Sequence, residues 1–126
     1  MPGHIYHPNG QIAFVGPGQT NSGFAYHDDG SRALIGSGTG RGIAYHKNGR
    51  HAFIGPGRTD SGFGYYKNGN TAFVGPGRTN SGYAYYENGQ VASRDGGGIG
   101  YEIGPGLSIW VSNRGLQLYV YGRPVL

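Results

Sequence analysis

Residues 62–75 read GFGYYKNGNTAFVG, with Asn68-Gly69 between two runs of aromatic and β-branched residues. Asn-Gly in this setting is the strongest short-range signal for a β-hairpin, because a two-residue type I′ turn requires positive φ at both central positions. A turn of this type sets the register of the whole hairpin. The predicted cross-strand pairs are Tyr66 with Thr71, Tyr65 with Ala72, Gly64 with Phe73 and Phe63 with Val74.

The hairpin pattern is repeated along the chain with a period of 19 or 20 residues, and the copies begin at Tyr6, Tyr26, Tyr45, Tyr65 and Tyr85. A fixed period in this range is typical of repeat architectures, in which each unit is one supersecondary element stacked on its neighbours. We therefore expect an all-β fold, an elongated single-layer antiparallel meander of about five 20-residue hairpin repeats. A β-solenoid is the alternative, because both faces of each predicted hairpin are apolar.

The last part of the chain departs from the repeat. Residues 107–112 and 116–121 alternate apolar and polar side chains around a turn at 113–115, which predicts a further hairpin. Terminal units that differ from the others commonly cap a repeat stack. We therefore divide the chain into hairpin repeats at 1–104 and a distinct C-terminal capping or docking hairpin at 105–126, within one continuous domain.

Composition and charge narrow the classes of protein to which this chain can belong. Its 126 residues include 28 glycines, 11 tyrosines and no cysteine, so it has neither a disulfide framework nor a thiolate metal site. The net charge of +4 permits an acidic partner without choosing one. No apolar run approaches the ~20 residues of a membrane span. We expect a cytoplasmic protein with no transmembrane segment.

The residues around the turns resemble a known repeat. Tyr85-Tyr86-Glu87-Asn88-Gly89-Gln90 and Tyr65-Tyr66-Lys67-Asn68-Gly69 are similar to the core of the MORN repeat in its Tyr-Tyr-x-Asn-Gly variant, and His7-Pro8-Asn9-Gly10 fits the same positions. The resemblance covers roughly residues 3–100. It implies a twisted single-layered sheet of consecutive hairpins. It also implies scaffolding in cytoskeletal, ciliary or junctional assemblies, in some cases with contact to membrane lipids.

The histidines form a regular array, but their spacing argues against a metal site. His7, His27 and His46 occupy the same repeat position, and equivalent residues of neighbouring hairpins are two strands, or about 9.6 Å, apart. The ligands of one zinc ion each lie about 2.1 Å from the metal. His46 and His51 are expected to face each other across one hairpin, without an evident third ligand. We expect no metal and no cofactor.

Residues suited to catalysis are not arranged in a matched pattern. Ser22, Ser61 and Ser81 lie beside glycine in turns, and no histidine or acid accompanies them in a triad-like order. The glycine-rich turns lack the Lys-Ser or Lys-Thr pair and the following helix of a phosphate-binding loop. We predict that the protein is not an enzyme and has no catalytic residue.

The leading interpretation is a structural scaffold that mediates protein–protein interactions within a larger assembly, because extended apolar surface normally marks a partner site. The candidate contact residues are aromatic: Phe24, Tyr26, Phe63, Tyr65, Tyr83, Tyr85, Trp110, Tyr119 and Tyr121. Arg41, Arg58 and Arg78 lie on one rim and suit an acidic partner such as a tubulin filament surface. The alternative is an aromatic platform for a sugar, a lipid headgroup at a membrane surface, or a nucleic acid, the least favoured of the three.

Overall fold

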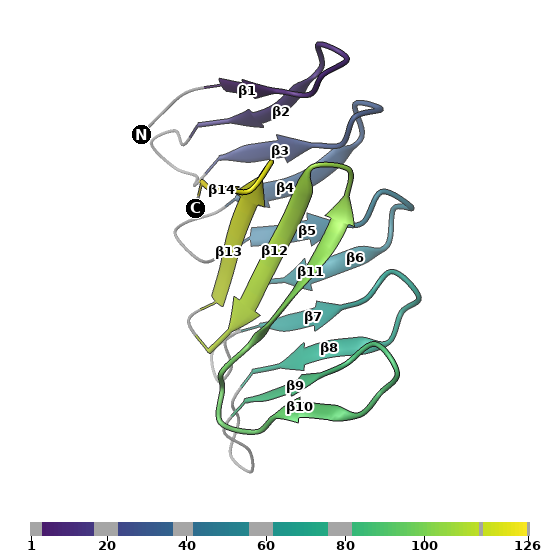
Figure 1. The fold of residues 1–126 in the computed structure, drawn as a ribbon, viewed down its shortest axis with the longest axis vertical. Coiled ribbons are helices and arrows are strands. Elements are labelled where there is room, and N and C mark those ends of the chain that lie inside the picture. Colours follow the sequence, from purple (N-terminus) through teal and green to yellow (C-terminus); the bar gives the residue numbers. More distant parts are fainter. Residues whose placement is uncertain are drawn as a thin grey trace.

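The computed structural model describes residues 4–16, 23–36, 42–55, 62–75, 82–113 and 115–125, which form two antiparallel β-sheets and contain no helix (Figure 1). The larger sheet, termed the meander, has ten strands in chain order. They are β1 (His4–Tyr6), β2 (Ile12–Val15), β3 (Phe24–Tyr26), β4 (Arg32–Gly36), β5 (Gly42–Tyr45), β6 (His51–Ile54), β7 (Phe63–Tyr65), β8 (Thr71–Val74), β9 (Tyr83–Tyr85) and β10 (Val91–Ser93). The smaller, or second, sheet contains β11 (Ile99–Gly104), β12 (Leu107–Ser112), β13 (Gly115–Val120) and β14 (Arg123–Pro124).

Strand pairing confirms the meander. Each strand of the larger sheet pairs with the next strand in the chain, and each of these pairings is antiparallel. A β-solenoid would instead place equivalent residues of successive repeats in parallel neighbouring strands. The solenoid alternative is therefore wrong for the described strands. The described part of the chain also holds no helical segment with the length and hydropathy of a membrane span.

The turns at the hairpin tips differ from the predicted type I′ turn. In the fourth hairpin, the Gly69 amide donates to the Tyr66 carbonyl at 2.9 Å, and the Tyr66 amide donates to the Asn70 carbonyl at 2.8 Å. The loop therefore has three residues, of which only Gly69 has a positive φ, at 92°. This is the pattern of a type I turn followed by a glycine bulge. Asn68 stabilises this turn, because its Oδ1 accepts a hydrogen bond from the Asn70 amide at 2.9 Å.

A bulge further along the hairpin restores the expected register. Tyr65 pairs with Thr71 instead of Ala72, and the register then shifts so that Gly64 pairs with Phe73, as predicted. The extra loop residue and the bulge thus cancel each other. The same shift occurs in the first three hairpins. The alanine at each of these four bulges is fully buried: Ala13, Ala33, Ala52 and Ala72.

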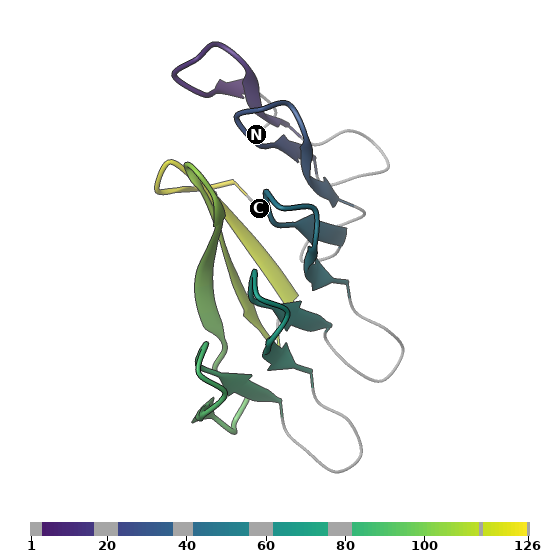
Figure 2. The same cartoon turned by 90° about the vertical axis from the view of Figure 1, so that its right-hand side faces the viewer.

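The C-terminal strands fold back across one face of the meander and form a second layer (Figure 2). This sheet begins at Ile99, ahead of residue 105, where we expected the terminal hairpin to start. The expected hairpin is present as β12 and β13, with Val111 paired with Leu116. The buried residues of this hairpin are Leu107, Ile109, Val111, Leu116, Leu118 and Val120, and β11 adds Ile103. The segment therefore covers a face of the meander and does not cap its end.

The core lies between the two sheets. From the meander it contains Ala13, Phe14, Ala25, Ala33, Leu34, Ala44, Ala52, Phe53, Phe73 and Ala84. A single sheet would leave these side chains exposed to water. Packing of the two sheets is therefore favourable, because burial of apolar surface is the main favourable term in folding. The alternation of side chains places the tyrosines of β1, β3, β5, β7 and β9 on the opposite side, which we term the open face. The second sheet does not cover the open face.

Candidate functional site

One inward-facing position of each of the first four hairpins forms a hydrogen bond to the next hairpin, and together these bonds make a ladder. The contacts are His7 Nε2 to the Tyr26 carbonyl at 2.8 Å, His27 Nε2 to the Tyr45 carbonyl at 2.8 Å, His46 Nε2 to the Tyr65 carbonyl at 2.7 Å, and the Tyr66 hydroxyl to the Tyr85 carbonyl at 2.5 Å. A carbonyl can only accept, so each imidazole donates from Nε2. The repeated histidines therefore tie successive hairpins together.

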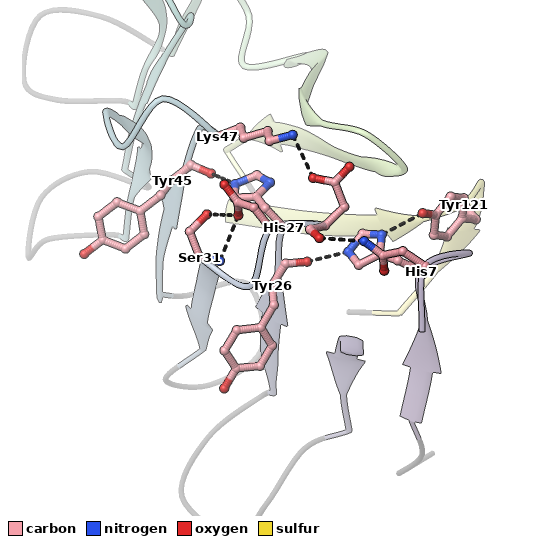
Figure 3. A network of polar contacts seen from close by, with 10 residues as sticks. His7, Tyr26, His27, Ser31, Tyr45, Lys47 and Tyr121 are labelled. Atoms are coloured by element: carbon pink, nitrogen blue, oxygen red, sulfur yellow. Dashed lines mark hydrogen bonds and ion pairs between the residues drawn. The ribbon is translucent and has the colours of Figure 1, made fainter. Parts of the chain in front are cut away.

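The ladder also contacts the second sheet, and we term this contact the seam (Figure 3). Tyr121, in the turn after β13, donates from its hydroxyl to His7 Nδ1 at 2.6 Å. Tyr101 of β11 lies against His46 with the ring centroids 6.0 Å apart, and its hydroxyl donates to the Ala52 carbonyl at 2.6 Å. Burial raises the pKa of Tyr101 far above its ordinary value, so this hydroxyl keeps its proton.

His27 is the most enclosed histidine of the ladder. Its side chain is fully buried, and its Nδ1 has no hydrogen-bond partner among the described residues. A Cβ added at Gly104 of β11 would collide with this ring. Desolvation lowers the pKa of both His27 and His46, and the carbonyl bond of each histidine offsets only part of that effect. The negative charge of Asp29 raises the pKa of His27, and the positive charge of Lys47 lowers it. Both imidazoles are therefore neutral at pH 7.

Acidification is expected to weaken the fold through His27 and His46. Above the ordinary histidine pKa of about 6.5, both are neutral in the folded and unfolded chains, and their contribution to the free energy of unfolding is fully present. Below that value the unfolded chain takes up protons first, so the free energy of unfolding falls with pH. Urea unfolding between roughly pH 7 and pH 5 measures this slope. Replacing both histidines with Gln keeps an N–H donor for the carbonyls but removes the titrating group, so the slope should become flatter. An unchanged slope would assign the effect to other groups.

The histidines do not assemble into a metal site in the described residues, where no group of three or more His, Cys, Asp or Glu side chains comes together. The expected His46–His51 pair is wrong. Because the turn has three residues, His51 pairs with Tyr45 on the open face, and their rings lie 5.1 Å apart. His46 points to the seam on the other side of the sheet.

Charged groups at the tips of the second and third hairpins are used locally. Lys47 Nζ forms an ion pair with Asp28 Oδ1 at 2.8 Å, which raises the pKa of Lys47. The Ser31 hydroxyl and amide donate to Asp29 Oδ1 at 2.6 and 2.9 Å, which lowers the pKa of that carboxyl. The Lys47 amide donates to the Ile103 carbonyl at 3.0 Å. These contacts fix the hairpin tips and join one of them to β11.

A groove of about 420 Å³ opens where the third hairpin meets β11. It is lined by His46, Lys47, Asn48, Lys67, Glu102, Ile103 and Gly104. Lys47 is already paired with Asp28, and Glu102 opposes the charge of Lys67. The balance of charge does not favour a particular ionic ligand.

The open face and the adjoining tips carry a row of shallow grooves between consecutive hairpins, each walled by the tyrosine of the later hairpin. Between the first and second hairpins, a groove of about 500 Å³ is lined by Gly10, Gln11, Ile12, Val15, Tyr26 and Gly30. Between the fourth and fifth, one of about 400 Å³ is lined by Asn70, Thr71, Val74, Tyr85 and Gly89. Between the second and third, one of about 250 Å³ is lined by Ser31, Arg32, Tyr45, His46, Lys47 and Gly49. Figure 3 shows the phenol rings of Tyr26 and Tyr45 pointing away from the histidine ladder.

The structure gathers part of the predicted contact set. Six residues share the open face: Phe24, Tyr26, Phe63, Tyr65, Tyr83 and Tyr85. The C-terminal aromatics do not form one patch, because Trp110 and Tyr119 lie on the outer side of the second sheet and Tyr121 lies in the seam. The predicted rim residues Arg41, Arg58 and Arg78 lie outside the described residues.

Sequence reasoning missed Tyr101 and the polar groove residues. One signal for Tyr101 was present. Gly64 stands where the other hairpins have Ile5, Ala25, Ala44 and Ala84, and a Cβ there would lie 2.6 Å from the Tyr101 hydroxyl. The single glycine in this row marks the place where a side chain of the second sheet crosses the meander.

Comparisons with protein-family models, with curated proteins and with solved structures found no match. The resemblance to the MORN repeat remains a prediction from the turn residues. The functional argument therefore proceeds from the fold, the seam and the grooves.

Proposed function

We propose that the protein is a non-catalytic scaffold that binds an extended protein partner along its open face. The row of tyrosine-walled grooves carries this proposal, because such a groove is described at three of the four junctions between hairpins. Sites for small molecules are usually single concave pockets. A shallow groove repeated along a stack instead suits a long partner, as in other repeat proteins with extended binding surfaces.

The second sheet supports this role by occupying the opposite face. Of the two apolar faces that the sequence showed, one is buried against β11–β13. The polar contacts of Tyr101 and Tyr121 across the seam hold the meander on a second layer. A partner thus has one face of a supported sheet on which to bind, and binding residues on a rigid support lose less entropy on association.

The wider setting of the scaffold is also a proposal. A larger assembly in the cytoplasm, of cytoskeletal or ciliary type, follows from the MORN-like turns. The basic charge of +4 permits an acidic filament surface as a partner of the rim, apart from the grooves of the open face. The rim arginines that would steer such a partner are outside the described residues.

Photo-crosslinking in an extract of the native source tests the scaffold. A benzophenone side chain in place of Tyr65, on the open face, should give a discrete adduct, whereas the same group in place of Tyr119 should not. Tyr26→Ser, Tyr45→Ser and Tyr85→Ser should each reduce the adduct modestly and together remove it, because the contact is spread over several grooves. A single one of these substitutions that abolishes the adduct in a folded protein would indicate a discrete site and contradict the scaffold.

A further inference from the structure

The spacing of the grooves restricts the conformation of an extended partner. The grooves lie between consecutive hairpins, so equivalent positions are separated by two strands of the meander. Two strand spacings amount to about 9.6 Å. A chain that runs across the strands, along the stack of hairpins in Figure 1, must present equivalent side chains at this interval.

Two extended conformations differ in this interval. A β-strand returns its side chains to the same face every second residue, or about every 6.7 Å, and is out of step by the next groove. A polyproline II helix has three residues per turn and a rise of about 3.1 Å, so its equivalent side chains recur about every 9.3 Å. The polyproline II conformation stays in step with the grooves over several hairpins.

The chemistry of the groove walls agrees with a proline-rich chain. The side chains that line the first and last described grooves are uncharged: Gln11, Ile12, Val15 and Tyr26 in one, and Asn70, Thr71, Val74 and Tyr85 in the other. Uncharged walls complement an uncharged partner and would not compensate an acidic or phosphorylated one. Aromatic-lined grooves are the surfaces on which polyproline II segments dock.

The same walls provide hydrogen-bond donors. A polyproline II segment has no internal hydrogen bonds, so its carbonyls must find donors. The phenol of tyrosine and the side-chain amide of Gln11 are donors of the required kind. The Asn70 amide gives one N–H to the Glu87 carbonyl at 3.0 Å and keeps a second N–H to donate. The groove at Tyr45 differs, because Arg32 and Lys47 also line it. An acceptor-rich turn of the partner fits that position.

We propose that the open face binds an uncharged, proline-rich protein segment in the polyproline II conformation, with one turn of the segment in each groove. This inference rests on the proposed function, since it names the class of segment that the scaffold takes. It places the specificity in the grooves at Tyr26, Tyr45 and Tyr85.

A synthetic peptide tests the proposal. The probe is a fluorescein-labelled peptide of repeated Pro-Pro-Leu units, and a length of roughly twelve residues spans the three described grooves with one intervening turn. Binding is measured by fluorescence anisotropy at low and high salt, and it should change little with salt because the contacts are uncharged. Tyr26→Ser should weaken binding about threefold, and the triple change at Tyr26, Tyr45 and Tyr85 about thirtyfold if the grooves act independently.

The chain offers a matched control in Tyr6. It stands at the same repeat position but lines none of the three described grooves, so Tyr6→Ser should leave binding unchanged. A peptide of the same composition with irregularly spaced leucines should bind several-fold more weakly. If the triple variant does not fold, NMR shift changes in the unaltered protein decide. They should fall on Ile12, Val15, Val74 and their neighbours, and not on the second sheet.

Three results would overturn the proposal: absence of binding by the regular peptide, equal binding of the irregular peptide, or an equal effect of Tyr6→Ser. A membrane or nucleic acid ligand would appear as salt-dependent binding to anionic vesicles or oligo-dT that the tyrosine changes reduce. If the peptide fails while the Tyr65 crosslink still gives its adduct, the scaffold stands and only the polyproline II assignment is wrong. If both fail, the proposed function falls as well.

Discussion

Removal of residues 105–126 is expected to make the protein self-associate. The truncation deletes β12–β14 and uncovers the inner face of the meander, where Phe14, Leu34, Phe53 and Phe73 are buried. Burial of one such side chain is worth about 1.5–3 kcal/mol. A small domain has a net stability of only about 5–15 kcal/mol, so this loss is of the same size as the whole. Size-exclusion chromatography with light scattering, and binding of an apolar dye, measure the result.

The control for the truncation removes apolar surface from the outer side of the second sheet. Trp110→Ser combined with Tyr119→Ser leaves the buried rows intact, and the variant should remain soluble with an unchanged elution volume. A truncated protein that does not associate and melts at the same temperature would contradict the layered core. The second sheet would then serve only as a docking element.

Phe53→Ala is expected to be the most damaging single substitution that we consider. Phe53 is fully buried between the two sheets, and replacement of a core phenylalanine by alanine costs about 3–5 kcal/mol. The next residue provides a matched control, because Ile54 points to the open face and is 37% exposed. Ile54→Ala should cost about 1 kcal/mol or less. The free energy of unfolding from urea titration compares the two. Equal losses would mean that the second sheet does not bury Phe53 in solution.

The turn residues show how far local sequence predicts this fold. Asn-Gly, replaced by Asp-Gly in the second hairpin, correctly marked the tips of the five repeat hairpins, and the outer pair of Gly64 with Phe73 was confirmed. The inner pair of Tyr65 with Ala72 was wrong, because the loop has three residues and only its glycine needs a positive φ. Both turn types accept the same dipeptide. The choice depends on whether an alanine bulge further along the strand can take up the extra residue.

The candidate site residues were likewise predicted only in part from the sequence. The aromatic residues of the open face were predicted, since they follow from alternation along each strand. The groove-lining Gln11 and Asn70 were not, because the groove also needs the tyrosine of the following hairpin. The role of the histidines was not predicted either. Their acceptors are carbonyls of the neighbouring hairpin, and a pattern of side chains does not show which carbonyls remain within reach.

The sequence by itself determined the number and order of the repeat hairpins, the face of the aromatic residues on the first strand of each, and the apolar rows of the last hairpin. These properties are local, because they depend on turn residues and on alternation over a few positions. Only the tertiary structure decided which apolar face is buried. Tyr101 contacts Ala52 across 49 positions of the chain, and His7 contacts Tyr121 across 114. The two faces of the meander are similarly apolar, so their local patterns do not distinguish them. The choice depends on how the second sheet packs, with Gly64 leaving room for Tyr101 and Gly104 for His27.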